Sequence, residues 1–176
     1  MSPRLLATVI AVPVALMTGV LVFLLGMPGD QPPAEPNVAA TGPVTVTAAS
    51  LGERAEVVCR ALVAKLPEKV RDARRRPVSA GPEQNAAYGD PAVVLTCGVP
   101  TPSFPATDDV WGLNGVCWHA TRAAESTTWT TVDREVPVQV TVPGPADGSS
   151  QWVIGFANAI ASAVPSAKTV PSGCTG

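Results

Sequence analysis

Histidine, cysteine and serine are the residues of this chain that could supply a base or a nucleophile. His119 is the only histidine and lies two residues after Cys117, so the pair could act together in nucleophilic catalysis. We expect a structural role instead. In a strand, His119 points to the face opposite Trp118, and a cysteine in a disulfide cannot attack a substrate. No serine lies in a G-x-S-x-G pattern, and Asp108-Asp109 is typical of a turn.

Carboxylates near the start of predicted strands are a second candidate group. Asp133 and Glu135 flank Arg134, and Asp90 precedes a short apolar run. Such groups could do acid–base work in an envelope hydrolase or transferase, which is the alternative function that we consider. Nothing in the spacing sets the separation of the carboxylates, and Arg134 more simply balances their charge. We therefore assign no catalytic residue.

Four cysteines are present, and their even number fits two disulfides in an oxidising compartment. Metal sites favour close pairs such as C-x-x-C, whereas the closest two cysteines here, Cys97 and Cys117, are twenty positions apart. We therefore expect disulfides and neither a metal site nor a cofactor. Spacing leaves all three pairings open for Cys59, Cys97, Cys117 and Cys174.

Basic residues are concentrated in one stretch. Residues 53–76 hold eight Lys or Arg and four acids, a balance of +4, whereas residues 77–176 hold three and eight, a balance of −5. Guanidinium groups suit phosphate or carboxylate partners such as lipid head groups, an anionic wall polymer or an acidic protein. Alternatively, the arginines are solvated helix-end residues that pair with the acidic half. The candidate anionic-partner surface consists of Arg71, Arg74, Arg75 and Arg76.

The N-terminal segment predicts a membrane anchor. Residues 5–27 are an uncharged, mostly apolar run that is long enough for one transmembrane helix. Arg4 precedes the run and the next basic residue is Arg54, so residues 1–4 should form a cytoplasmic tail and the rest should lie outside. A cleavable signal peptide is the alternative, but its nearest small-x-small site, residues 38–40, lies far beyond the apolar run.

The remaining sequence divides into a spacer and one domain. Residues 28–43 contain five prolines and few large apolar side chains, which is typical of a linker. Residues 44–176 should form a single extracytoplasmic domain, since the chain has 176 residues, of which 46% are hydrophobic and 15% charged. The net charge of −2 argues against nucleic-acid binding.

Hydrophobic periodicity predicts the elements of this domain. Ser50 and Glu53 have capping-box spacing, so a helix should start there and end at Pro67. A last helix should follow Ser149 or Ser150 and end at Pro165. Its inward residues should be Val153, Phe156, Ala157, Ile160, Ala161 and Val164.

Three strands should lie between the helices, at 91–97, 127–132 and 136–142. In the third strand, valines alternate strictly with other residues. Because proline lacks an N–H, this strand should either lie at a sheet edge or open with Pro137. An exposed edge there could accept a partner strand. The order of elements predicts an α+β fold with helices on one face of a mostly antiparallel sheet.

Several segments, in order, resemble one protein family. They are residues 59–67 (CRALVAKLP), 87–100 (AYGDPAVVLTCGVP), 114–118 (NGVCW), 131–136 (TVDREV) and 140–143 (VTVP). Together they resemble the domain of unknown function 3515 family, an actinobacterial family of small exported or membrane-anchored proteins. The resemblance covers nearly all of the predicted domain, but it implies no activity.

The resemblance also implies a disulfide pairing. Family members usually carry Asp where this chain has Cys117, and the late Cys174 is also unusual. Two unusual cysteines are most simply partners of each other. We therefore expect Cys59–Cys97 to be the family's bridge and Cys117–Cys174 to be an added bridge that holds the C-terminal tail. An acid at position 117 is then not required for function.

These observations predict a single-pass protein of the cell membrane whose domain lies in the cell envelope. The most economical function is a non-catalytic binding or assembly module. Its partners would be the membrane, through residues 5–27, and an envelope protein or an anionic surface.

Overall fold

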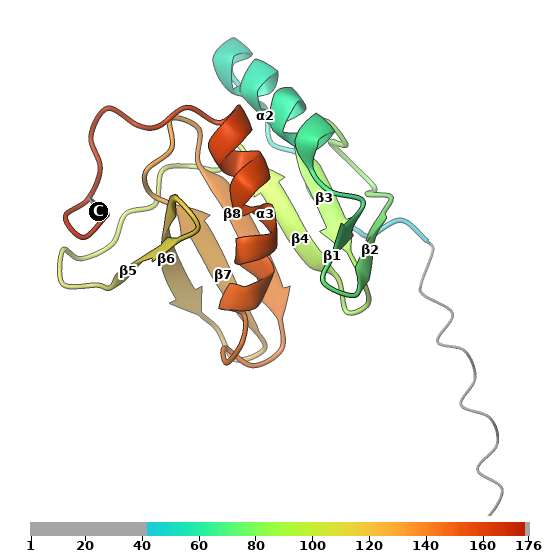
Figure 1. The fold of residues 1–176 in the computed structure, drawn as a ribbon. Coiled ribbons are helices and arrows are strands. Elements are labelled where there is room, and N and C mark those ends of the chain that lie inside the picture. Colours follow the sequence, from blue (N-terminus) through green and yellow to red (C-terminus); the bar gives the residue numbers. More distant parts are fainter. Residues whose placement is uncertain (1–41, 175–176) are drawn as a thin grey trace, which may run out of the picture. The chain divides into compact units, whose positions relative to one another are not determined.

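Eight strands form one antiparallel sheet in residues 42–174, the part of the chain that this computed structural model describes (Figure 1). The sheet order is β1-β2-β3-β4-β8-β7-β6-β5. The helices are α2 (Glu53–Lys65) and α3 (Ser150–Ala163). The strands are β1 (Lys69–Val70), β2 (Ala73–Arg76), β3 (Asn85–Tyr88), β4 (Val93–Cys97), β5 (Val110–Leu113), β6 (Val116–Arg122), β7 (Ser126–Thr131) and β8 (Val138–Pro143).

The predicted tail at 1–4, the predicted anchor at 5–27 and nearly all of the predicted linker lie outside the described residues. Within residues 42–174, no helix combines the length and the apolar character needed to cross a bilayer.

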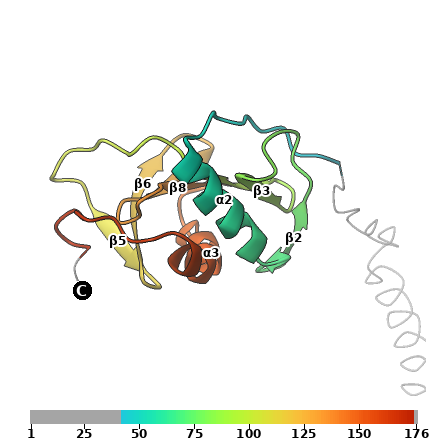
Figure 2. The same ribbon diagram turned by 90° about the horizontal axis from the view of Figure 1, so that it is seen from above.

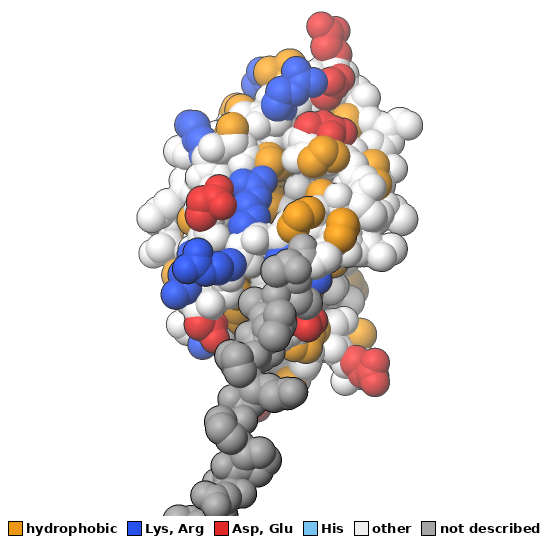
Figure 3. Space-filling model, turned by 90° about the vertical axis from the view of Figure 1, so that its right-hand side faces the viewer, with side chains coloured by type: hydrophobic (Ala, Val, Ile, Leu, Met, Phe, Trp, Pro, Cys, Tyr) orange, Lys and Arg blue, Asp and Glu red, His pale blue; other side chains and the backbone are white. Residues whose placement is uncertain are grey.

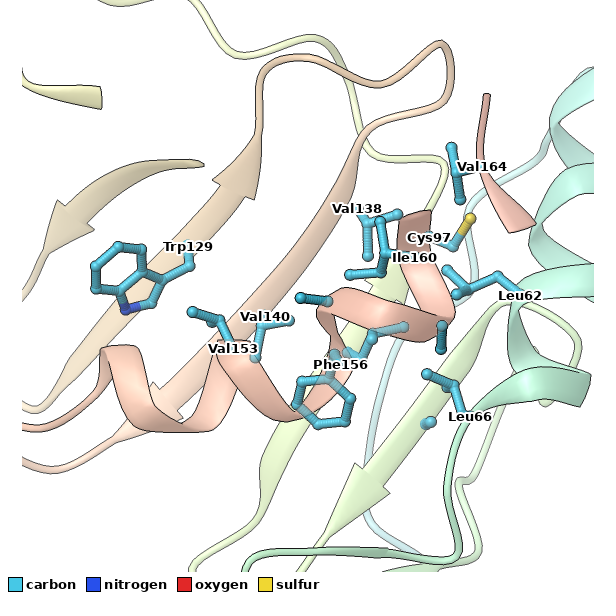
Figure 4. Packing of buried hydrophobic residues seen from close by; sticks show 14 of the residues in the cluster. Leu62, Leu66, Cys97, Trp129, Val138, Val140, Val153, Phe156, Ile160 and Val164 are labelled. Carbon is cyan, nitrogen blue, oxygen red and sulfur yellow. The ribbon is translucent and has the colours of Figure 1, made fainter. Parts of the chain in front are cut away.

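Both helices pack on the same face of the sheet, which confirms the α+β prediction (Figure 2). The three valines of β8 are buried and alternate with half-buried residues, as a sheet with one covered face requires. Val138 and Val140 project toward Phe156 and Ile160 of α3 and are fully buried with them (Figure 4). This contact forms the centre of the core.

Of the two alternatives predicted from Pro137, an edge position for β8 is wrong, whereas a place for Pro137 at the opening of the strand agrees with the structure to within one residue. Strand β8 lies in the middle of the sheet, where it pairs with β4 on one side and with β7 on the other. Pro137 comes immediately before the strand, so its missing N–H removes no ladder bond, and its carbonyl accepts from Gly98 N–H at 2.9 Å. A partner strand therefore cannot add at β8.

Helix α2 begins without the predicted capping box. Gly52 is its N-cap, and no side chain caps this end, because the first helical bond runs from Glu56 N–H to Gly52 O and leaves Ser50 outside the helix. The helix ends before Pro67, as predicted. The arginines at 74–76 are not helix-end residues, since they lie in strand β2.

Helix α3 follows Ser149 as predicted, with one change in its buried face. Ser149 makes no capping bond; its hydroxyl accepts from Trp129 Nε1 at 3.0 Å instead. Ala161 is exposed and Ala159 is buried in its place. The helix therefore turns slightly more of its Ala159 side toward the sheet than the periodicity indicated.

Both predicted disulfides are confirmed. Cys59 of α2 is bonded to Cys97 of β4, and Cys117 of β6 is bonded to Cys174 of the C-terminal tail. The first bridge joins a helix to the sheet inside the core, where both cysteines are fully buried. The second fastens the tail to the far end of the sheet.

The only tyrosine should make stability fall at alkaline pH. Tyr88 is fully buried in β3, and its hydroxyl donates to Pro67 O at 2.8 Å. Burial raises the pKa of Tyr88 from 10.0 to about 12. Because the unfolded chain loses this proton first, the stabilisation is complete below pH 10.0 and is lost as pH rises through about 12.

Ultraviolet absorbance of the tyrosinate tests this directly, because a single tyrosine supplies the whole signal. Ionisation should occur about two pH units above that of free tyrosine and should coincide with unfolding. A Tyr88→Phe variant should lose this component of the alkaline destabilisation. Ionisation near pH 10 in a protein that stays folded would contradict the prediction.

Candidate functional site

The β1–β2 hairpin carries the predicted basic surface, but only half of the four arginines are available to a partner. Arg71 and Arg74 are exposed, and Lys69, which faces Arg74 across the hairpin, is exposed with them. The Arg71 guanidinium lies 5.2 Å from the centre of the Trp152 ring, so a cation–π contact orients it. We call Lys69, Arg71 and Arg74 the basic hairpin.

Arg75 and Arg76 hold the structure together instead. Arg75 Nη1 donates to Val63 O at 3.2 Å, which ties β2 to α2. Arg76 donates to Gly89 O at 2.8 Å and to Gly42 O at 2.9 Å, and it lies 3.7 Å from Asp90. These side chains are partly buried and are held by backbone carbonyls, so they contribute little to an external contact.

The basic hairpin is not a uniformly positive surface. Exposed Glu68 and Asp72 lie beside it, and Figure 3 shows acidic side chains interspersed with basic ones on this end of the molecule. The local excess of positive charge is therefore small, and any attraction to an anion should be sensitive to salt.

The carboxylates considered for catalysis are held in separate ion pairs. Glu135 accepts from Arg54 Nε and Nη2 at 3.0 and 2.9 Å. This hydrogen-bonded pair lowers the pKa of Glu135 and raises that of Arg54. Asp133 lies 3.3 Å from Arg134. Among the described residues no interaction joins Asp133 to Glu135, and each is paired with a different arginine.

Arg134 is a structural residue at the centre of a small buried network. Its side chain is 7% exposed. Nη2 donates to Gly115 O, while Nη1 lies 3.4 Å from both Val164 O and Ser166 Oγ. The guanidinium therefore joins the β5–β6 turn to the segment after α3.

His119 is not paired with Cys117 but with a residue that the sequence suggested only as a turn. Its Nε2 lies 3.1 Å from Asp108 Oδ2, and its ring stacks on Phe104 at 4.1 Å with an angle of 7°. Asp108 does lie in a turn, since its N–H donates to Pro105 O at 3.0 Å. His119 thus fixes the loop that connects β4 to β5.

A cleft of about 550 Å³ lies beside this loop and was not predicted. The loop forms one wall, and the tail that Cys174 fastens to Cys117 forms the other. Its polar side chains are Thr101, Ser103, Asp108 and Ser172, and its apolar ones are Pro102, Phe104, Ala106, Val110, Val132 and Pro171. The volume is in the range of ligand sites in proteins.

The one sequence signal for this cleft is the predicted Cys117–Cys174 pairing, because that bond brings the residues near 172 to strand β6. Within residues 42–174, no three His, Cys, Asp or Glu side chains converge as metal ligands would. All four cysteines are in disulfides, so none is a free nucleophile.

These features define a small disulfide-bonded α+β domain with a basic hairpin at one edge of the sheet and a cleft at the other. A family model described as a protein of unknown function (DUF3515) matches residues 10–169. The chain therefore belongs to the DUF3515 family. No curated protein and no solved structure matches it significantly.

Proposed function

We propose that this protein is a single-pass, membrane-anchored binding module of the cell envelope that carries out no reaction. In this proposal residues 1–4 are cytoplasmic, residues 5–27 cross the membrane and residues 28–43 are a spacer. Residues 44–176 then form the extracytoplasmic domain, whose basic hairpin contacts an anionic surface.

The position of Gly42 is the observation that supports this arrangement most. Gly42 O accepts from Arg76 of β2, and Val44 pairs with Val78 just after β2. The described chain thus begins beside the hairpin (Figure 1). A tether that ends at Gly42 would therefore join the domain at the edge of the sheet that carries Arg71 and Arg74.

The length of the spacer is compatible with this contact. An extended proline-rich chain rises about 3.1 Å per residue, so sixteen residues reach about 50 Å and can also fold back. Each Lys or Arg near an anionic membrane contributes about 1 kcal/mol of attraction. Because Glu68 and Asp72 offset part of this attraction, the three cations of the basic hairpin supply only a weak contact, which the anchor supports by keeping the domain near the membrane.

The proposal of binding without catalysis draws on the fact that the candidate catalytic groups already have structural partners. Asp133 and Glu135 are each neutralised by an arginine, and the cysteines are oxidised. No observation favours the hydrolase or transferase alternative over binding, so we do not propose it.

Charge reversal on the hairpin should strongly weaken attachment to anionic vesicles. The fragment 43–176 should co-sediment with vesicles of phosphatidylcholine and phosphatidylglycerol at low salt, and less at high salt. Arg71→Glu with Arg74→Glu should weaken binding by at least tenfold, since the loss of about 1 kcal/mol per cation is about 30-fold for two.

Arg60→Glu with Arg122→Glu is the matched control, because it changes net charge equally on other exposed surfaces. It should reduce binding much less than the hairpin variant. Equal reductions would show that only net charge matters, and failure of the unaltered fragment to bind anionic vesicles would remove the proposed surface.

A further inference from the structure

The cleft between the β4–β5 loop and the C-terminal tail is held open by fixed walls. Cys117–Cys174 anchors the tail covalently, and Gly173 packs so closely on β5 that an added Cβ would lie 3.1 Å from Val110 Cγ2. Ala167 N–H also donates to Asp133 O at 2.8 Å, which fixes the start of the tail. A preformed site of this kind avoids the entropy cost of ordering a wall on binding.

The opposite wall is fixed by His119. Its imidazole binds Asp108 Oδ2 and covers one face of the Phe104 ring. The other carboxylate oxygen, Oδ1, makes no hydrogen bond to any residue from 42 to 174. Asp108 and Phe104 both line the cleft, so His119 acts as a positioning residue that presents an acceptor and an aromatic ring to the cleft.

The chemistry of the lining excludes some ligand classes. No Lys or Arg lines the cleft, so a phosphate or carboxylate ligand would have no cation to pair with. A purely apolar ligand would leave Asp108 Oδ1 and the hydroxyls of Thr101, Ser103 and Ser172 without partners where it covers them. A simple cation is also disfavoured, because Asp108 is already shared with the imidazole of His119.

From this lining we propose that the cleft binds a neutral saccharide of one or two rings. A sugar ring has a rim of hydroxyl groups and two faces of C–H groups. The rim matches one carboxylate and three hydroxyls, whereas the faces match Phe104 and the proline rings of Pro102 and Pro171. About 550 Å³ is enough for such a ligand.

This site is independent of the proposed attachment surface. It lies by β5, at one end of the strand order, whereas the basic hairpin lies at the other end, in β1 and β2. The sugar-binding proposal stands whether or not the hairpin binds a membrane.

Binding to the full chain in zwitterionic detergent without a sugar head group tests the proposal. Maltose, cellobiose and N,N′-diacetylchitobiose are titrated separately by calorimetry and saturation-transfer NMR, with choline and inorganic phosphate as comparison probes. At least one disaccharide should bind at millimolar concentration. Asp108→Asn should weaken its binding by about tenfold, whereas Asp109→Asn, which changes the neighbouring exposed carboxylate, should leave it unchanged.

A second variant separates blocking of the cleft from damage to the fold. Ser172 is exposed on the tail, so Ser172→Trp should fill the cleft and eliminate binding without disturbing the core. Three outcomes would overturn the proposal: no disaccharide binds, choline or phosphate binds in their place, or a disaccharide binds equally well to the Ser172→Trp variant.

Discussion

Replacing Cys59 and Cys97 together with alanine should lower the free energy of unfolding by about 2–5 kcal/mol. The bridge spans a sequence separation of 38 residues, for which restriction of the unfolded chain alone accounts for about 4 kcal/mol. Both cysteines are fully buried between α2 and β4, so the native state keeps their positions when the bond is absent. Urea unfolding monitored by circular dichroism measures the change in midpoint.

The second bridge supplies the control. Cys117–Cys174 spans 57 residues, so loop closure by itself would predict a slightly larger effect. Cys174, however, lies in a tail outside the sheet. Without the bond, this tail gains conformational entropy in the native state as well as in the unfolded state, and the two gains partly cancel. Replacing Cys117 and Cys174 with serine should therefore cost less. An equal or larger cost would show that the tail is an integral part of the cooperative fold.

Replacing Arg134 with methionine should lower stability by about 3–5 kcal/mol. The substitution leaves Asp133 as a partly buried carboxylate without its cation and removes the donor to Gly115 O. It also separates the β5–β6 turn from the residues that follow α3. The cost arises mainly because buried polar groups lose their partners. The free-energy penalty for an unpaired buried group is larger than the net stabilisation that its hydrogen bond provides.

Arg54→Met is the matched control for this prediction. Its partner Glu135 is exposed, so solvent screens the pair and its loss should change the unfolding midpoint only slightly. Near-normal stability of the Arg134→Met variant would contradict a structural role for Arg134. Any functional effect of Asp133→Asn must accordingly be compared with its effect on folding before it is assigned to chemistry.

Local patterns predicted the parts of the fold that depend on burial of one face. The alternating valines of β8 and the three- and four-residue spacing in α3 follow from the geometry of strands and helices, and the structure confirms them except at Ala161. The short strands β1, β2, β3 and β5 were missed. Each has only two to four residues, too few for an alternation that distinguishes it from a turn.

The roles of polar residues were harder to predict, because a side chain's partner can lie far away in the sequence. Arg75 and Arg76 looked like surface charges, yet each donates to a backbone carbonyl more than ten positions away. Asp108 looked like a turn residue, and its partner His119 becomes available only through the β5–β6 pairing.

Sequence patterns were sufficient for the α+β class, the buried faces of the principal elements and, through the family resemblance, the pairing of the cysteines. The three-dimensional structure was needed to show that β8 lies in the middle of the sheet, which arginines remain available, and that the loop before β5 and the tail border a cleft. This division arises because periodicity records which side of an element is buried. Strand order and long-range hydrogen bonds depend on the element packed against that side, which local sequence does not specify.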